Sequence, residues 1–125
     1  MKPEILAEAE ALYQKPLFDL LHEAHQVHRQ YHEAADIQKC QLLSIKTGAC
    51  PEDCAYCPQS VHYNTEIKRE PLMEIAAVRE KAQEAKSCGA SRFCMGAAWR
   101  SVREGKSFET VLGMIRAVKE EGLES

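Results

Sequence analysis

Three cysteines within eight residues are the side chains of this 125-residue sequence most suited to chemistry. Cys50, Cys54 and Cys57 are separated by three residues and then by two. Thiolates are soft ligands that suit iron–sulfur clusters and zinc. No fourth cysteine continues the spacing, so a cluster of four irons would keep one iron without a protein ligand. Because that iron could bind a small molecule, the site is predicted to be a reaction centre and not only an electron relay.

The two-residue gap between Cys54 and Cys57 predicts a tight turn that keeps both sulfurs on one side, and the neighbouring residues favour such a loop. Pro51 and Pro58 restrict the backbone at its entry and exit, and Gly48 leaves freedom to fold around a bulky inorganic core. Tyr56 lies between two thiols, where its ring could stack on a nucleobase. A structural zinc site is the competing interpretation, although such sites usually take four ligands, often in two separated pairs. Short-loop cysteines without a recognisable secretory signal argue against disulfides.

Composition narrows the possible partners. The sequence is 45% hydrophobic and 28% charged, as expected for a globular protein, and it lacks the run of about 20 apolar residues that a membrane span needs. A net charge of −3 gives no general attraction to nucleic acid or anionic lipid. We therefore expect a cytoplasmic protein with neither a nucleic-acid nor a membrane partner.

Two helices are predicted before the cysteine loop. One covers residues 5–13, and the other begins at Pro16 and carries an apolar stripe as far as Tyr31. Histidines at one edge of the second helix are spaced like metal ligands, but no carboxylate or cysteine completes a site, so a partly exposed helix edge is the favoured interpretation. They are His25, His28 and His32.

Two strand–loop–helix units follow. Residues 42–45 are predicted to be a strand that leads directly into the cysteine loop, and Pro71 is placed to begin a helix that ends at Gly89. Residues 91–95 are the second predicted strand. Ser107 is placed to cap the next helix, whose apolar stripe consists of Phe108, Val111, Leu112, Ile115 and Val118.

This alternation predicts parallel strands joined by right-handed crossovers. The fold class is therefore α/β, and two parallel strands cannot close a barrel. We expect the N-terminal part of a (β/α) TIM-type barrel, with its first two β/α units in residues 41–125 and a helical segment in residues 1–40. Both informative motifs would lie at the carboxyl ends of the strands, where such folds place their chemistry.

The cysteine pattern resembles the signature of the radical S-adenosylmethionine (SAM) superfamily. Residues 42–60 and 92–100, the second reading Arg-Phe-Cys-Met-Gly-Ala-Ala-Trp-Arg, closely resemble the biotin synthase family. The likeness runs from about Pro16 to Ser125. Since it covers well under half of a family member, the sequence is interpreted as an incomplete N-terminal portion, with further strands expected beyond Ser125.

The resemblance implies an activity and cofactors. A [4Fe–4S] cluster on Cys50, Cys54 and Cys57 would bind SAM and cleave it by one electron to a 5′-deoxyadenosyl radical. That radical would abstract hydrogen from dethiobiotin, and sulfur insertion would give biotin. The resemblance also implies an electron donor of the flavodoxin or ferredoxin type, a homodimer when complete, and no activity of this portion alone. No catalytic side chain is assigned.

The second motif gives further candidate residues. From the sequence alone Cys94 is favoured as a buried structural cysteine, whereas the resemblance implies that it holds a [2Fe–2S] cluster, the sulfur donor, with two cysteines and an arginine from later strands. Gly96 and Ala97 are either a tight turn or, as the resemblance implies, a close backbone approach to SAM. Cys40 and Cys88 match no motif and are interpreted as ordinary small apolar residues.

Two alternative functions stay open. Another radical SAM enzyme would share the cysteine loop, although residues 92–100 argue against it. A non-catalytic iron–sulfur or zinc-binding module is compatible with an incomplete barrel.

Overall fold

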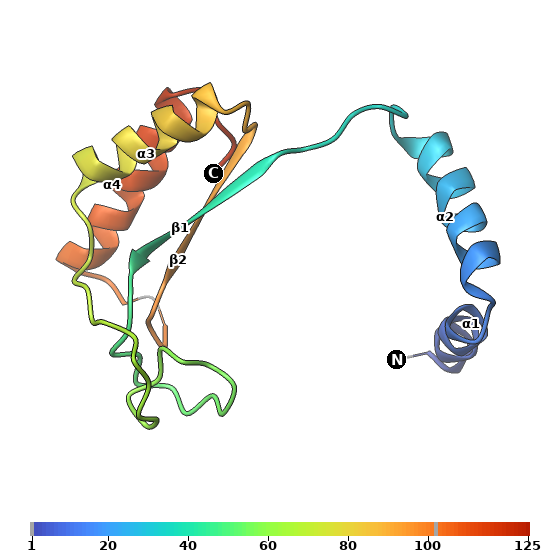
Figure 1. Cartoon of the computed structure of the whole chain (residues 1–125), viewed down its shortest axis with the longest axis horizontal. Helices are drawn as coiled ribbons and strands as arrows, with labels where there is room; N and C mark the ends of the chain where they lie inside the picture. Colours follow the sequence, from blue (N-terminus) through green and yellow to red (C-terminus); the bar gives the residue numbers. More distant parts are fainter. Residues whose placement is uncertain (1, 102) are drawn as a thin grey trace. The chain divides into compact units, whose positions relative to one another are not determined.

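The computed structural model describes residues 2–101 and 103–125, and these residues divide into two units on either side of the boundary between residues 37 and 38. Figure 1 shows the elements of both units. Their bounds are α1 (Pro3–Tyr13) and α2 (Leu17–Tyr31) in the first unit, and β1 (Cys40–Lys46), α3 (Ile75–Ser87), β2 (Arg92–Ala97) and α4 (Lys106–Glu120) in the second. Within the described residues, every helix is too short or too polar to cross a membrane.

The first unit is a pair of helices with little interior. Pro16 directly precedes the first residue of α2, close to its predicted role, whereas α1 begins at Pro3, two residues before the predicted start. Neither helix has a buried residue. Apolar side chains such as Phe18 and Tyr31 are therefore largely exposed.

The second unit contains a two-stranded parallel sheet. β1 and β2 pair in the register Cys40↔Arg92 through Lys46↔Ala97, with one irregularity after Ser44. α3 connects the two strands, and α4 follows β2. The predicted strand–helix–strand–helix order and the parallel pairing are confirmed. The structure shows an α/β arrangement with an open sheet.

Within the second unit, one face of this sheet is covered and the other is bare. Figure 1 shows α3 and α4 on the same side of the strand pair. The core between them consists of Ile45 and Phe93 from the strands, Val78, Ala82 and Ala85 from α3, Met114 and Val118 from α4, and Leu123. On the opposite face the side chain of Leu42 is 69% exposed. We refer to this surface, which carries Cys40, Leu42, Ser44, Cys94 and Gly96, as the bare face.

The predicted start of α3 was wrong. The helix begins at Ile75 and not at Pro71, because the backbone N–H of Met73 donates to the carbonyl oxygen of Ile45 at 2.9 Å. This bond keeps the preceding segment extended along β1, and Leu72 packs against the core from there.

Ser107 is not the cap of α4. The helix begins one residue before it, at Lys106, and Gly105 occupies the capping position with φ 136°, a conformation that favours glycine. The predicted helix ends are confirmed. Gly89 and Gly122 both adopt positive φ values after α3 and α4, respectively.

Candidate metal centre

The cysteine loop begins where β1 ends. Gly48 and Ala49 both have left-handed backbone conformations, with φ values of 69° and 53°. They turn the chain away from the strand directly before Cys50. For alanine this conformation costs about 1–2 kcal/mol, so the surrounding structure must hold it.

Hydrogen bonds close the loop at its two ends. The backbone N–H of Cys50 donates to the carbonyl oxygen of Gln59 at 3.0 Å, and that of Val61 donates to the carbonyl oxygen of Cys50 at 2.9 Å. The side-chain oxygen of Gln59 accepts a further bond from the N–H of Gly48 at 3.0 Å. Residues 48–61 therefore form a closed loop whose first thiol lies at the junction.

Ser60 organises the interior of the loop. It is 6% exposed, and its hydroxyl donates to the carbonyl oxygen of Glu52 at 2.6 Å while accepting from the N–H of His62 at 3.2 Å. The N–H of Cys57 donates to the carbonyl oxygen of Cys54 at 2.9 Å, which closes a tight turn between these two cysteines. This turn matches the one predicted from their spacing.

The donor set suits a soft metal centre. Cys50, Cys54 and Cys57 are each half-buried and free of disulfides. Among residues 2–101 and 103–125, no three His, Cys, Asp or Glu side chains are gathered as a metal site. The three thiols nevertheless share one closed loop and offer the ligand type that iron–sulfur clusters take. Because metal binding commonly completes the order of its own ligands, the residues fit such a cluster by their chemistry.

The exit of β2 is tied to the cysteine loop. The ammonium group of Lys46 donates to the carbonyl oxygens of Gly48 and Ala98 at 3.0 and 2.9 Å. The guanidinium group of Arg100 pairs with the carboxylate of Glu52, with 2.8 Å between Nε and Oε1. This pair is largely exposed, so it positions the two loops more than it stabilises them. The carboxyl ends of both strands thus meet at one edge of the sheet.

Comparison with known proteins shows which proteins this chain is similar to. No protein-family model matches it. It is 57% identical to the biotin synthase of Photobacterium profundum over 120 residues, which make up 96% of the chain. The chain is a biotin synthase homologue. It is also 58% identical to the biotin synthase of Zymomonas mobilis over 114 residues and 54% identical to that of Methylobacterium nodulans over 121 residues.

The similarity covers nearly all of this chain but only part of each relative. The aligned residues cover 34% of the Photobacterium profundum protein and 36% of the Methylobacterium nodulans protein. The chain therefore spans about a third of the length of the biotin synthases that it matches. The predicted resemblance is confirmed over nearly all of this chain.

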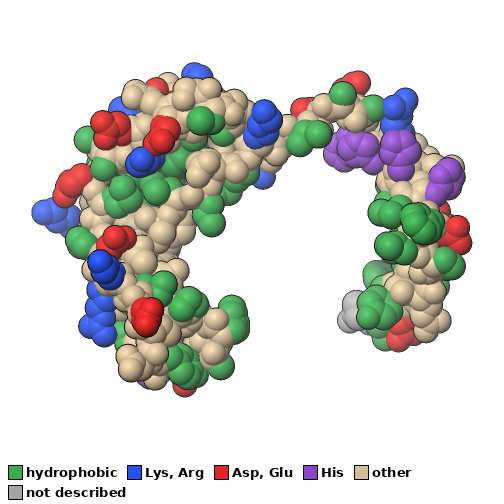
Figure 2. Space-filling model, in the orientation of Figure 1, with side chains coloured by type: hydrophobic (Ala, Val, Ile, Leu, Met, Phe, Trp, Pro, Cys, Tyr) green, Lys and Arg blue, Asp and Glu red, His purple; other side chains and the backbone are tan. Residues whose placement is uncertain are grey.

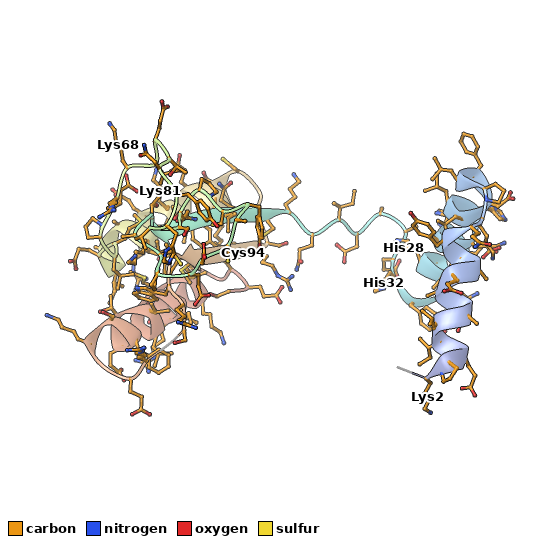
Figure 3. All side chains as sticks on the ribbon, turned by 90° about the horizontal axis from the view of Figure 1, so that it is seen from below. Lys2, His28, His32, Lys68, Lys81 and Cys94 are labelled. Carbon is orange, nitrogen blue, oxygen red and sulfur yellow. The ribbon has the colours of Figure 1, made fainter. Side chains whose placement is uncertain are left out.

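The second motif of this biotin synthase homologue lies on β2. Cys94, labelled in Figure 3, is half-buried and belongs to the bare face of the sheet. Its Sγ is 3.1 Å from the Sγ of Cys40 on β1. The hydrogen bond with Cys40 raises the pKa of the Cys94 thiol, and desolvation raises it further. Cys40 was predicted to be an ordinary apolar residue, so the sequence interpretation missed this contact.

The other sequence-predicted residues lie in different environments. Tyr56 is 92% exposed between the second and third loop cysteines. A side chain added at Gly96 would meet no atom within 4 Å, so the backbone there is open on the bare face. Ala97, by contrast, packs against the core on the helix side. Gly96 therefore leaves open space on the bare face, whereas Ala97 lies on the opposite face of the sheet.

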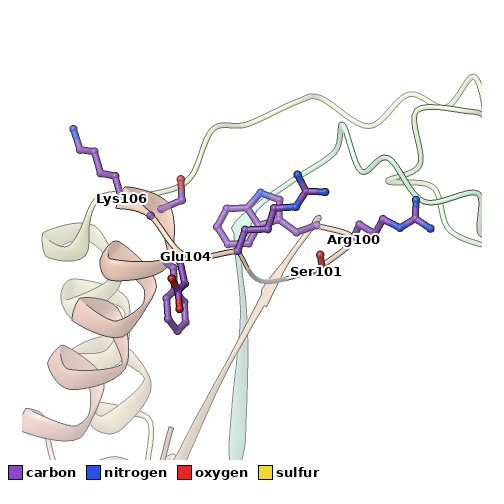
Figure 4. A pocket seen from close by; sticks show the side chains of 9 residues that line it. Arg100, Ser101, Glu104 and Lys106 are labelled. Atoms are coloured by element: carbon purple, nitrogen blue, oxygen red, sulfur yellow. The ribbon is translucent and has the colours of Figure 1, made fainter.

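A hollow lies beyond the exit of β2. It measures about 390 Å³, and its lining includes Trp99 and Phe108. Figure 4 shows Arg100, Ser101, Glu104 and Lys106 around it. In this view the side chain of Arg100 points away from α4. The salt bridge with Glu52 accounts for that direction.

The histidines of α2 gather on the surface of the first unit. Figure 2 shows the histidine side chains side by side, and Figure 3 labels His28 and His32. The rings of these two are stacked, with centroids 5.3 Å apart and an interplanar angle of 22°. His25 and His32 are exposed and His28 is half-buried, which agrees with the predicted, partly exposed helix edge.

Proposed function

We propose that this chain supplies the [4Fe–4S] site of a biotin synthase, the enzyme that converts dethiobiotin to biotin. Cys50, Cys54 and Cys57 would hold the cluster. The cluster together with SAM would supply the one-electron chemistry that activates an unreactive carbon–hydrogen bond. The observation that carries the proposal is identity above 50% across 96% of the chain, a stretch long enough to contain the cysteine loop.

The chain's own residues would bind and orient the reactants. The closed loop and the buried hydroxyl of Ser60 would fix the path of the backbone around the cluster. Tyr56 is free to stack on the adenine of SAM, since its ring is exposed beside the thiols. Gly96 would let the amino-acid part of SAM approach the strand, because nothing occupies the space in front of its backbone.

We infer further that residues 41–125 begin a (β/α) barrel and that residues 1–40 precede it. Parallel sheets are normally covered on both faces, yet here α3 and α4 cover only one. In a closed barrel the helices lie outside and the other face points inward. The exposed Leu42 and the half-buried Cys94 would then face the barrel interior. The bare face would then lie on the side of the sheet that we propose for substrate binding.

Other parts of the proposal extend beyond this chain. Cys94 would be one ligand of a [2Fe–2S] sulfur donor whose remaining ligands come from other parts of the enzyme. The proposed partners are dethiobiotin, a flavodoxin- or ferredoxin-type electron donor, and a second subunit. A cytoplasmic location is consistent with six unpaired cysteines.

A chimera tests this function directly. The chain would replace the matching third of the Photobacterium profundum biotin synthase, and biotin formation from dethiobiotin would be measured anaerobically with SAM and reductant. We expect product from the chimera and none from its Cys54→Ala variant. The Cys88→Ser variant should keep full activity, because Cys88 lies at the end of α3, away from the loop. An inactive chimera that folds and binds its clusters would contradict the proposal.

The 125-residue chain by itself provides the complementary comparison. It should form no biotin above a cluster-free control, because it carries only one proposed ligand of the sulfur-donating cluster. Repeated turnover by the chain alone would show that the proposed division of ligands is wrong.

A further inference from the structure

Lys46 joins the carboxyl ends of the two strands. It is the last residue of β1, and it lies opposite Ala97, the last residue of β2. Its ammonium group donates to the carbonyl oxygens of Gly48 at 3.0 Å and of Ala98 at 2.9 Å. The backbone N–H of Ala98 in turn donates to the carbonyl oxygen of Lys46 at 3.0 Å. Lys46 therefore bonds the segment that follows each strand.

An irregularity in the sheet register accompanies these contacts. Ser44 lies opposite Gly96 and Lys46 lies opposite Ala97, so β1 advances by two residues where β2 advances by one. This is the pattern of a β-bulge, which re-aims a nearby side chain and is frequent next to active sites. The register therefore accounts for a lysine side chain that reaches along the strand ends.

The cysteine loop depends on this contact through Gly48, which is held from both sides. Its carbonyl oxygen accepts from Lys46, and its N–H donates to the side-chain oxygen of Gln59 at 3.0 Å. Gly48 and Ala49 have the left-handed conformations that turn the chain toward Cys50. This conformation is unfavourable for alanine, so the bonds to Gly48 help to hold the turn that places the first thiol.

The two carbonyl groups lie in sheltered positions. Gly48 and Ala98 are buried, and Lys46 is half-buried. A buried carbonyl oxygen that loses its donor destabilises the segment that carries it, because little water is present to replace the bond. Hydrogen bonds from a charged donor are also stronger than those between neutral groups. The contact is therefore worth more than an exposed lysine contact would be.

We propose that Lys46 is a positioning residue of the cluster, whose ammonium group fixes the cysteine loop against the exit of β2. The inference rests on the proposed function for the identity of the reactants, since the loop would hold the cluster and the backbone at Gly96 would face SAM. Carbonyl oxygens accept the protons of the ammonium group but do not neutralise its charge. That charge should ease reduction of the cluster, because a nearby cation stabilises the added electron.

The first test uses the full chain without metal, so it does not depend on the proposed function. Amide hydrogen exchange would be compared among the parent, Lys46→Met, which has no charge or donor, and Lys46→Arg, which keeps both. In Lys46→Met the amides of Cys50 and Ala98 should exchange about 10–100-fold faster, as expected for loss of a charge-assisted hydrogen bond. The amide of Phe93, which bonds the carbonyl oxygen of Glu124, should change little. Lys46→Arg should stay close to the parent.

The second test is the midpoint potential of the reconstituted loop cluster, with the variant that has Cys50, Cys54 and Cys57 replaced by alanine as the background. Lys46→Met should lower the potential, and Lys46→Arg should keep it near that of the parent. Lys68→Met is the matched control. Lys68 is exposed (Figure 3), so solvent screens its charge and its loss should shift the potential less.

The two tests separate the possible failures. Absence of a cluster in the parent would contradict the proposed function, whereas the exchange rates would still test the contact. Unchanged exchange at Cys50 and Ala98 in Lys46→Met would overturn the inference, and so would equal acceleration at Phe93 or an unchanged potential in an intact cluster. If Lys46→Met does not fold, Lys46→Arg decides. Retained exchange rates would support the inference, and a loss of protection at Cys50 and Ala98 would overturn it.

Discussion

Replacing Cys54 with alanine is expected to abolish the loop cluster. The change removes one of three thiolates. The two that remain cannot hold a [4Fe–4S] cluster, which already lacks a fourth protein ligand here. Anaerobic reconstitution followed by iron and sulfide analysis would measure the loss. We expect the content of the loop site to fall to the background of the variant that lacks all three cysteines.

A matched cysteine provides the control for this prediction. Cys88 is exposed at the C-terminal end of α3, so Cys88→Ala should leave iron and sulfide content unchanged. Unchanged cluster content in the Cys54→Ala protein would show that the loop is not the site. Zinc in place of iron in the parent protein would instead favour a structural zinc site.

Phe93→Ala is expected to destabilise the second unit by about 3–5 kcal/mol, a large part of the stability of a small domain. The side chain is 1% exposed and packs between β2 and the two helices, so its removal leaves a cavity in the only core that the described residues of this unit form. Urea denaturation followed by circular dichroism would measure the change in the free energy of unfolding.

Leu42 offers the corresponding control on the other side of the sheet. It is 69% exposed, and Leu42→Ala should change the free energy of unfolding by no more than about 0.5 kcal/mol. A loss as large as that for Phe93→Ala would mean that the bare face is covered in solution. The proposed inward orientation of that face would then need another explanation.

The order of the elements was predictable because their signals are local. Pro16 before α2 and the glycines that end α3 and α4 determine helix ends through their own backbone preferences. The cysteine spacing likewise predicted the turn between Cys54 and Cys57. These signals need no knowledge of distant contacts.

The features that the sequence analysis missed are those that depend on contacts between residues far apart in the sequence. The hydrogen bond from Met73 to Ile45 delays the start of α3, and no nearby residue signals it. The contact between Cys40 and Cys94 depends on the register of two strands separated by more than 50 residues. Strand alternation places Cys40 on the face of Leu42, but only the pairing brings it to Cys94.

The most direct test of the proposed site is the response of its cluster to SAM. Electron paramagnetic resonance of the reduced chimera would be recorded with and without SAM isotopically labelled in its amino and carboxylate groups. The three-thiolate assignment predicts a changed spectrum with coupling to the labelled atoms, lost in the Cys54→Ala variant. An intact cluster whose spectrum is the same with and without SAM would contradict it.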